Sequence, residues 1–134
     1  MKKVLLWLWQ LPQNLLGLLV ILFTGAKRTS YESISHWLIK NPDNTKYFGV
    51  SLGSYIIFGN YPDKLSFKHE QGHQKQSMYL GPLYLLIIGL PSIIGNVFDR
   101  LFHKKWPVSK RISRYYKLPW EAWADKLGDV ERWI

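Results

Sequence analysis

The sequence predicts a mainly helical α+β domain with a short β-hairpin or strand and two apolar, membrane-associated helical elements. Three observations lead to this prediction: apolar stretches at residues 4–23 and 79–98, helical spacing in the segments on either side of residues 47–58, and a β-type pattern within that segment. A chain of 134 residues, 47% of them hydrophobic, suits a single domain over residues 1–134 with a modest core.

The composition restricts the chemistry that the chain can support. There is no cysteine, which excludes a disulfide framework, a thiolate zinc site, an iron–sulfur cluster and a cysteine nucleophile. Any metal must therefore be bound by His, Asp or Glu. The formal net charge of +9 indicates an anionic partner, either nucleic acid or acidic lipid. Lipid is favoured because no nucleic-acid recognition motif is present and the basic cluster adjoins an apolar run.

Residues 1–25 form the apolar N-terminal element. Lys2 and Lys3 precede the apolar run, residues 10–14 interrupt it with polar side chains, and Trp7 and Trp9 suit a membrane interface. A secretory signal peptide shares the basic start and the apolar run, but residues 24–28 do not form a convincing small-x-small cleavage site. We therefore expect a retained membrane or interfacial helix in two parts.

The next segments alternate between helical and β-type patterns. Residues 30–40 read as a short amphipathic helix with Ile34, Trp37 and Leu38 on one side. Residues 47–58 are rich in β-branched and aromatic side chains, which predicts a strand or hairpin. Residues 65–80 then predict a helix that Gly81 and Pro82 terminate.

The second apolar stretch, residues 79–98, is followed directly by a basic segment. Residues 100–117 hold seven Lys and Arg side chains and no acidic one, a juxtamembrane pattern. Five residues that disfavour a straight helix interrupt the apolar stretch: Gly81, Pro82, Gly89, Pro91 and Gly95. We therefore expect a broken or re-entrant helix. The alternative is a pair of buried core helices in a soluble protein.

The helix predicted over residues 65–80 contains the sequence H-E-Q-G-H at residues 69–73. His69 and His73, four positions apart, project from one helix face, so that both imidazoles can reach a single metal ion. Glu70 lies between them and can act on a water molecule beside the metal as a general base. The residues therefore predict a metal site with a proton-transfer group.

A catalytic zinc site needs a third protein ligand, and His36, His103 and the carboxylates are the candidates. His36 beside Trp37 has the simpler interpretation of a surface or partly buried residue, and His103 that of a member of the charged face. Residues 118–128 predict another helix, with proline in its first turn and glycine at its end. Glu121 and Asp125 share one face of that helix.

H-E-x-x-H followed by E-x-x-A-D, the latter at residues 121–125, resembles the gluzincin metallopeptidases, especially the membrane-associated HtpX-like and CaaX-prenyl-protease group. The resemblance implies a minimal zincin-like domain with Zn²⁺ as its cofactor. It also implies that Glu121 is the third zinc ligand and that Asp125 accepts a hydrogen bond from a ligating histidine. The resemblance rests on about ten signature residues and the alternation with apolar segments.

The chain departs from those relatives in two respects. Fewer than fifty residues separate His73 from Glu121, and few residues follow Asp125 to supply the late side chain that often stabilises the oxyanion. Arg132 is one candidate donor. Tyr116, with Tyr115 beside it, is better placed in the sequence, and we name Tyr116 as the second catalytic residue after Glu70.

These features predict zinc-dependent hydrolysis of peptide bonds by a small membrane-associated metallopeptidase. The expected partners are a peptide or protein substrate and membrane lipid, without nucleic acid, and the strand at residues 55–58 would offer its edge to the substrate. The active site is expected on the cytoplasmic side. The alternative is a catalytically inactive zinc-binding membrane scaffold or interaction protein, against which Glu70 is the discriminating residue.

Overall fold

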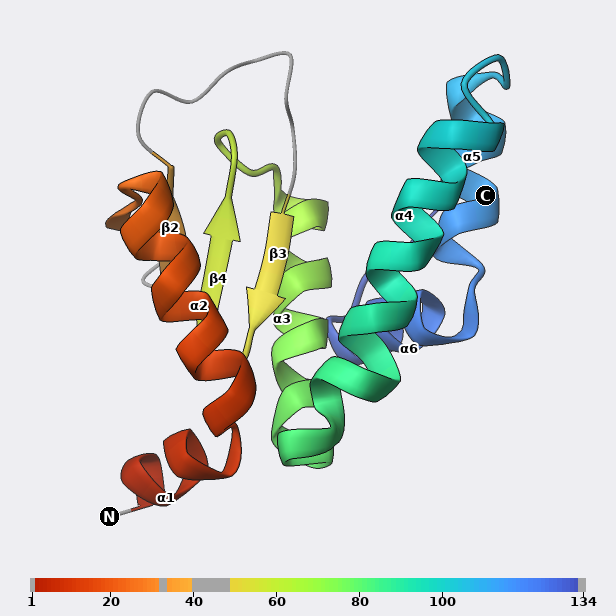
Figure 1. Ribbon diagram of the computed structural model, residues 1–134. Helices are drawn as coiled ribbons and strands as arrows, with labels where there is room; N and C mark the ends of the chain where they lie inside the picture. Colours follow the sequence, from red (N-terminus) through yellow and green to blue (C-terminus); the bar gives the residue numbers. More distant parts are fainter. Residues whose placement is uncertain (1, 32–33, 40–48, 133–134) are drawn as a thin grey trace.

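The computed structural model describes residues 2–31, 34–39 and 49–132, which form a mainly helical α+β structure as predicted (Figure 1). The helices are α1 (Lys2–Trp9), α2 (Leu11–Thr24), α3 (Lys64–Leu80), α4 (Leu90–Phe102), α5 (Val108–Tyr116) and α6 (Pro119–Leu127). Between α3 and α4 lie a 3-10 turn, η1 (Gly81–Leu83), and a π-helical segment, η2 (Leu85–Gly89). The strands are β1 (Lys27–Tyr31), β2 (Ile34–Leu38), β3 (Gly49–Leu52) and β4 (Tyr55–Phe58).

The four strands form one mixed sheet in the order β1-β2-β4-β3. Strand β2 pairs antiparallel with β1 and parallel with β4, and β3 pairs antiparallel with β4. A two-residue turn connects β3 to β4, and Gly53 takes the positive φ of 65° that this turn requires. The predicted hairpin is thus confirmed over residues 49–58, and residues 47–48 lie outside the described residues.

The helix predicted over residues 30–40 is wrong, because its described part belongs to β1 and β2. Three apolar positions were too few to distinguish a helical from an alternating pattern. In β2, His36 contacts Phe58, on one face of the sheet, whereas Trp37 contacts Tyr55 on the other. Pairing with strands on both sides determines the conformation of this segment.

Helices cover both faces of the sheet. Ile56 and Phe58 of β4 pack with Phe67 of α3 in the hydrophobic core, while Tyr55 lies against Gly17 of α2. Figure 1 shows α2 in front of the sheet and α3 behind it. The H-E-x-x-H helix is therefore fixed to the sheet by its own apolar residue, Phe67, two residues before His69.

The second apolar stretch breaks only at its beginning. Helix α3 ends at Leu80 and η1 follows, whereas from η2 to the end of α4 the chain is one helix, so the stretch is broken once, at η1. The N–H of Leu90 bonds to the carbonyl of Leu85, five residues back, which widens the turn just before Pro91, a residue without an N–H. By length and composition Leu85–Phe102 suffices to span a membrane.

The N-terminal element has the expected two parts. Helices α1 and α2 meet at Gln10 with a bend of 85°, and together they also pass the length and composition test for a membrane span. The side chain of Gln13 in α2 donates hydrogen bonds to Ser77 Oγ and to the carbonyl of Gly81, 2.8 Å each. These bonds attach α2 to the C-terminal end of α3.

Helix α6 packs very closely against α3. A Cβ atom at Gly72 would collide with the backbone carbonyl of Ala124, and one at Gly128 would collide with the carbonyl of Lys68. Ala124 itself is fully buried. Two glycines and one alanine thus allow the two helices to approach with their backbones in contact.

We expect Gly72→Ala to destabilise the protein by about 1–3 kcal/mol, because the added methyl group meets backbone that cannot rotate away. Gly95→Ala is the matched control: its methyl group would meet only the movable end of Leu118, 3.2 Å away, and alanine favours the helix by about 1 kcal/mol. Thermal unfolding of both variants in the same detergent gives the comparison. Equal midpoints for the two variants would contradict the close helix contact.

Candidate metal centre

Helix α3 presents the two histidines of the motif to one point. The helix begins at its N-cap Asp63, whose side chain accepts a hydrogen bond from the N–H of Ser66. His69 and His73 lie one turn apart with ring centroids separated by 4.7 Å, and both are buried. The i, i+4 spacing therefore places both imidazoles on the face that α6 covers.

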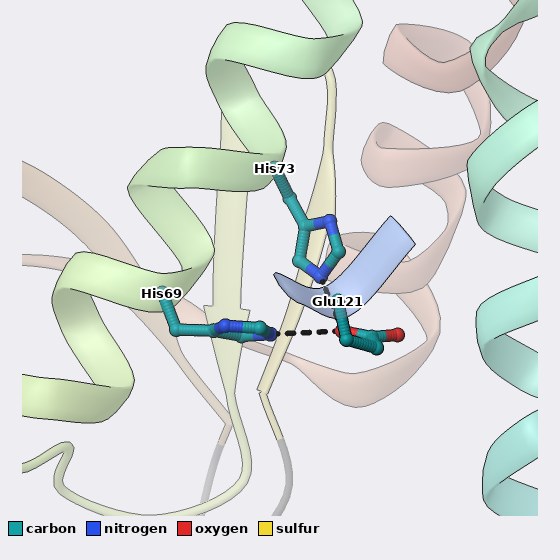
Figure 2. A group of neighbouring side chains, drawn as sticks. All are labelled: His69, His73 and Glu121. Atoms are coloured by element: carbon teal, nitrogen blue, oxygen red, sulfur yellow. Dashed lines mark hydrogen bonds and ion pairs between the residues drawn. The ribbon is translucent and has the colours of Figure 1, made fainter. Parts of the chain in front are cut away.

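Helix α6 brings the carboxylate of Glu121 to these two rings. Its Oε2 atom lies 3.0 Å from Nε2 of His69 and 3.1 Å from Nε2 of His73, and the side chain is completely buried. Figure 2 shows the three side chains converging from α3 and α6. The structure thus joins the three residues that the sequence analysis singled out as ligands, across 48 and 52 positions of sequence.

Each histidine is held by a second hydrogen bond on its other nitrogen. Nδ1 of His69 lies 2.6 Å from Oδ1 of Asp125, as expected, and Asp125 in turn accepts a hydrogen bond of 2.7 Å from Nε of Arg132. Nδ1 of His73 lies 2.6 Å from Oε1 of Gln76. Because carboxylate and amide oxygens only accept, both Nδ1 atoms carry a hydrogen, and both Nε2 atoms face the carboxylate of Glu121.

The other oxygen of Glu121 is also bound. Its Oε1 accepts hydrogen bonds from Ser92 Oγ at 2.6 Å and from the Tyr115 hydroxyl at 3.1 Å. Helices α4 and α5 therefore orient the carboxylate so that Oε2 remains directed at the histidines. Tyr115 acts here on Glu121, which distinguishes it from its neighbour Tyr116.

Nε2 of His69, Nε2 of His73 and Oε2 of Glu121 meet at one point, and their lone pairs would repel one another unless a proton or a metal ion lay between them. The ligand atoms of His69, His73 and Glu121 all lie within 4.8 Å of one another. The two N–O separations of 3.0 and 3.1 Å are close to the edge of a zinc tetrahedron, about 3.3 Å for bonds of about 2.0 Å. The donor set therefore fits a divalent cation bound by two imidazoles and one carboxylate.

The electrostatics of the centre also favour positive charge. Burial opposes a charge on His69, but hydrogen bonds to Asp125 and Glu121 raise its pKa to about 9. Burial likewise tends to raise the pKa of Glu121, yet hydrogen bonds with His69 and His73 hold it well below its usual range. Either protons or a metal ion can supply the positive charge that this centre favours, so protons would compete with a metal ion for the site.

Glu70 differs from Glu121 in its surroundings. It is buried, and its Oε2 atom has no hydrogen-bond partner among the described residues. Burial raises its pKa, and the charges of His73 and His69 offset this only in part. An unpaired buried polar oxygen costs about 1–3 kcal/mol, so Glu70 is not placed there for stability.

A cavity of about 390 Å³ adjoins the centre. His69, Glu70 and His73 form part of its wall, the edge strand β3 lines it on another side, and η2 with α4 lines it opposite. Tyr115 and Tyr116 complete it at the end of α5. The centre is thus open to a space that can hold water and part of an extended peptide.

Tyr116 lies beside His69 and lines the cavity. Its ring packs edge-on against His69, with centroids 5.0 Å apart, and the guanidinium of Arg132 lies 3.5 Å from the centroid of the tyrosine ring. Burial raises the pKa of Tyr116 to about 12, so its hydroxyl keeps its proton at neutral pH. Arg132 is engaged with Asp125 and Tyr116, so it holds the site together from outside.

The remaining two histidines lie away from the centre, but neither has the environment expected from the sequence. His36 is buried between Phe58 and Phe67, and not at the surface. His103 is buried as well: it stacks on Trp106 at 3.7 Å and bonds to Asp99, so it does not belong to an exposed charged face. In both cases neighbouring aromatic rings exclude the water that the sequence pattern led us to expect.

Two residues of the site were missed in the sequence. Gln76 follows His73 by three positions, a spacing that places its side chain within reach of the ring and could have been noticed. Ser92 was visible as one of few polar side chains in an apolar stretch, but its contact with Glu121 depends on how α4 folds back. Comparisons with known proteins add no further candidates, since no family model, curated protein or solved structure matches the chain.

We expect the purified chain to bind about one zinc ion, and Glu121→Ala to lose most of it, since removing one of three ligands leaves two imidazoles. Glu131→Ala removes an exposed carboxylate of the same type and should leave the metal content unchanged. Elemental analysis after dialysis against buffer measures both. Full retention of metal in Glu121→Ala would assign the third ligand to another residue.

Proposed function

We propose that this chain is a zinc-dependent metalloendopeptidase of the gluzincin type, with His69, His73 and Glu121 as the metal ligands. The observation that carries the proposal is the presence of two unlike carboxylates at one centre, of which Glu70 lines the cavity and Glu121 is completely buried behind it. Glu121 is bound into the three-atom centre, whereas Glu70 has a buried oxygen without a partner among the described residues. A base beside a metal with an open position is the arrangement that amide hydrolysis requires.

Zinc is the metal that this donor set favours. Two neutral imidazoles and a carboxylate are the protein ligands of catalytic zinc sites, which keep a further position for water or substrate. Among the described residues, the group that can hold an ion contains only these three. When bound, zinc polarises the scissile carbonyl and lowers the pKa of water.

Glu70 then performs the proton transfers. Its carboxylate takes a proton from the attacking water and passes it to the amide nitrogen that leaves, so the residue ends the cycle in its starting state. Burial raises the pKa of Glu70, which favours uptake of the proton from the attacking water. Glu121 cannot perform it, since both its oxygens are engaged.

Tyr116 is the residue that we propose for stabilising the oxyanion. The residue lines the cavity and its ring packs against His69, while its hydroxyl remains protonated and able to donate. Tyr115 donates to Glu121 and is therefore a positioning residue. Tyr116 would thus act on the substrate, and Tyr115 would orient the metal ligand Glu121.

An extended substrate would pair with the open edge of β3. The sequence interpretation assigned this role to residues 55–58, which is wrong because β4 is enclosed by β2 and β3. The closing pair of the hairpin is Leu52 with Tyr55, so Gly49 and Ser51 direct their backbone groups outward. Tyr84 already donates to the carbonyl of Ser51, and this contact marks the edge as facing the cavity.

The order of an edge strand, the H-E-x-x-H helix and a later helix with Glu121 supports a minimal zincin-like domain as the finer description of the fold. We also propose that the protein is associated with a membrane and that the site lies on its cytoplasmic side. The exposed apolar helices and the basic segment at residues 100–117 support this location. A peptide or protein and membrane lipid are the proposed partners.

We expect Glu70→Gln to keep its zinc and lose about 10³-fold or more in cleavage rate, because the amide cannot accept a proton. Gln71→Ala changes the next residue of the helix and should cleave like the wild type. Digestion of a peptide library followed by mass spectrometry supplies the substrates on which both variants are compared. Activity of Glu70→Gln within tenfold of the wild type would exclude it from the mechanism, and an inert wild type with bound zinc would favour the scaffold alternative.

Tyr116→Phe should lower kcat by about 10²-fold to 10³-fold with little change in KM or zinc content, since the hydroxyl acts on charge that develops only in the transition state. Tyr79→Phe alters an exposed tyrosine on α3 and serves as the control. The kcat and KM of both variants are measured on one peptide from the library. A change in KM alone would indicate that Tyr116 contributes to binding and not to oxyanion stabilisation.

A further inference from the structure

Helix α2 has the opposite burial pattern to an amphipathic helix of a soluble protein, because its polar side chains are buried and its apolar ones are exposed. It buries Gln13, Asn14 and Gly17 against the rest of the chain. Its outward side chains are large and apolar, and all are exposed: Leu11, Leu15, Leu16, Leu18, Leu19, Leu22 and Phe23. The buried polar groups bond to Ser77, Gly81 and Ser54, so this orientation is fixed by hydrogen bonds and is not a loose contact. An apolar medium outside the helix accounts for it.

The helix formed by η2 and α4 also exposes an apolar side, as α2 does. Its inward residues make hydrogen bonds to the rest of the protein: Ser92 donates to Glu121, and Asp99 accepts from Arg111. Its outward residues are exposed: Leu86, Ile87, Leu90, Ile93, Ile94, Val97, Phe98, Leu101 and Phe102. This helix is apolar over its whole length but only on one side, as in a helix that lies in a membrane surface.

The two apolar sides belong to one face of the molecule. In Figure 1, α2 and α4 lie in front, and α3, α5 and α6 lie behind them. Helix α3 runs alongside them and carries the exposed Lys64 and Lys75, while α5 carries Lys110 and Arg114. If α4 stood upright in a bilayer, these charges would enter the hydrocarbon with it, which is unfavourable. If α4 lies flat, they remain in water.

Basic residues bracket each of the exposed helices. Lys2 and Lys3 begin α1, and Lys27 and Arg28 follow α2. Arg100, Lys104 and Lys105 lie at the end of α4 and beyond it, and all seven are exposed. Lysine and arginine at such positions reach lipid phosphates with their charge while their stems stay on apolar surface. The occupant that this pattern fits is an anionic lipid leaflet.

The cavity opens on this face. Among the residues that line it are Leu16 of α2 and Ile93 and Val97 of α4, whose side chains are 40%, 60% and 48% exposed. They therefore belong both to the wall of the catalytic cavity and to the apolar face. A peptide that reaches Glu70 between α2 and α4 must pass through this part of the surface.

We propose that the protein is monotopic: the outer sides of α1, α2 and η2/α4 lie flat in one anionic leaflet, and the cavity opens sideways into the lipid. The substrate is then an extended segment drawn from the bilayer, a part of the inference that rests on the proposed peptidase activity. The lipid-facing orientation does not depend on that activity. It follows from the inverted burial of α2, the one-sided α4 and the charges behind them.

Single cysteines test this orientation, because the chain contains none of its own. Leu86→Cys, Ile94→Cys and Leu101→Cys sample both ends and the middle of the long helix. Leu16→Cys and Val97→Cys sample the cavity mouth. Lys75→Cys and Ala122→Cys are the exposed controls on the opposite side. Each is made in Glu70→Gln, labelled with the fluorophore NBD, and bound to vesicles of phosphatidylcholine and phosphatidylglycerol.

We expect lipids with a nitroxide on the acyl chain to quench most of the fluorescence at positions 86, 94 and 101, and to the same extent at each. Dithionite added outside the vesicles should abolish the NBD fluorescence at all three positions. The controls should be quenched by aqueous iodide and not by lipid. Ends of the helix reached from opposite sides would establish a spanning helix and overturn the proposal. So would lipid quenching no greater than in the controls.

The labels at positions 16 and 97 test whether the cavity opens into the lipid, independently of the orientation of the long helix. Lipid quenching at these two positions supports entry from the bilayer. Quenching by iodide alone would place the mouth in water and refute the proposed substrate class, while the metal centre and the flat orientation would stand. Because every variant carries Glu70→Gln, none of these outcomes depends on catalysis.

Discussion

The contact between α3 and α6 is the constraint on which the site depends. Gly72 and Gly128 remove the side chains that would hold the two backbones apart, and the fully buried Ala124 fills the contact. At that separation the short side chain of Glu121 reaches both imidazoles at once. A glutamate side chain is too short to reach both rings across a wider helix spacing. The geometry of the three side chains therefore depends directly on the packing of α3 against α6.

Two glutamates near the same pair of histidines acquire opposite properties from their surroundings. Glu121 is held by hydrogen bonds from Ser92 and Tyr115 and by the two imidazoles, which lower its pKa and fix it as an anion. Glu70 lacks such partners at one oxygen, and burial raises its pKa. In the proposed mechanism one glutamate is therefore the metal ligand and the other the proton acceptor, because hydrogen bonds stabilise the charge of Glu121 and not that of Glu70.

The interior of this small protein contains many polar side chains beside a small apolar core. The core cluster consists of Ile56, Phe58 and Phe67, whereas most large apolar side chains of the helices point outward. Burying one such side chain stabilises a protein by about 1.5–3 kcal/mol, so leaving many in water gives up a large part of the usual folding free energy. A lipid leaflet at that face would recover it, which links the membrane proposal to stability as well as to substrate access.

The sequence by itself determined the helices α3 and α6, the β3–β4 hairpin, the break in the N-terminal element and the three converging residues His69, His73 and Glu121. The elements and the pairing of His69 with His73 follow from local rules: spacing along a helix, caps and a short motif. Glu121 is identified as the third residue by the resemblance to the gluzincins, since the local patterns leave other histidines and carboxylates open. Only the tertiary structure decided that residues 34–38 form a strand, that β3 and not β4 is the edge, and that Ser92 and Tyr115 orient Glu121. It also decided which side of α2 faces outward. Each of these depends on a neighbour distant in sequence, and a local pattern carries no information about that neighbour.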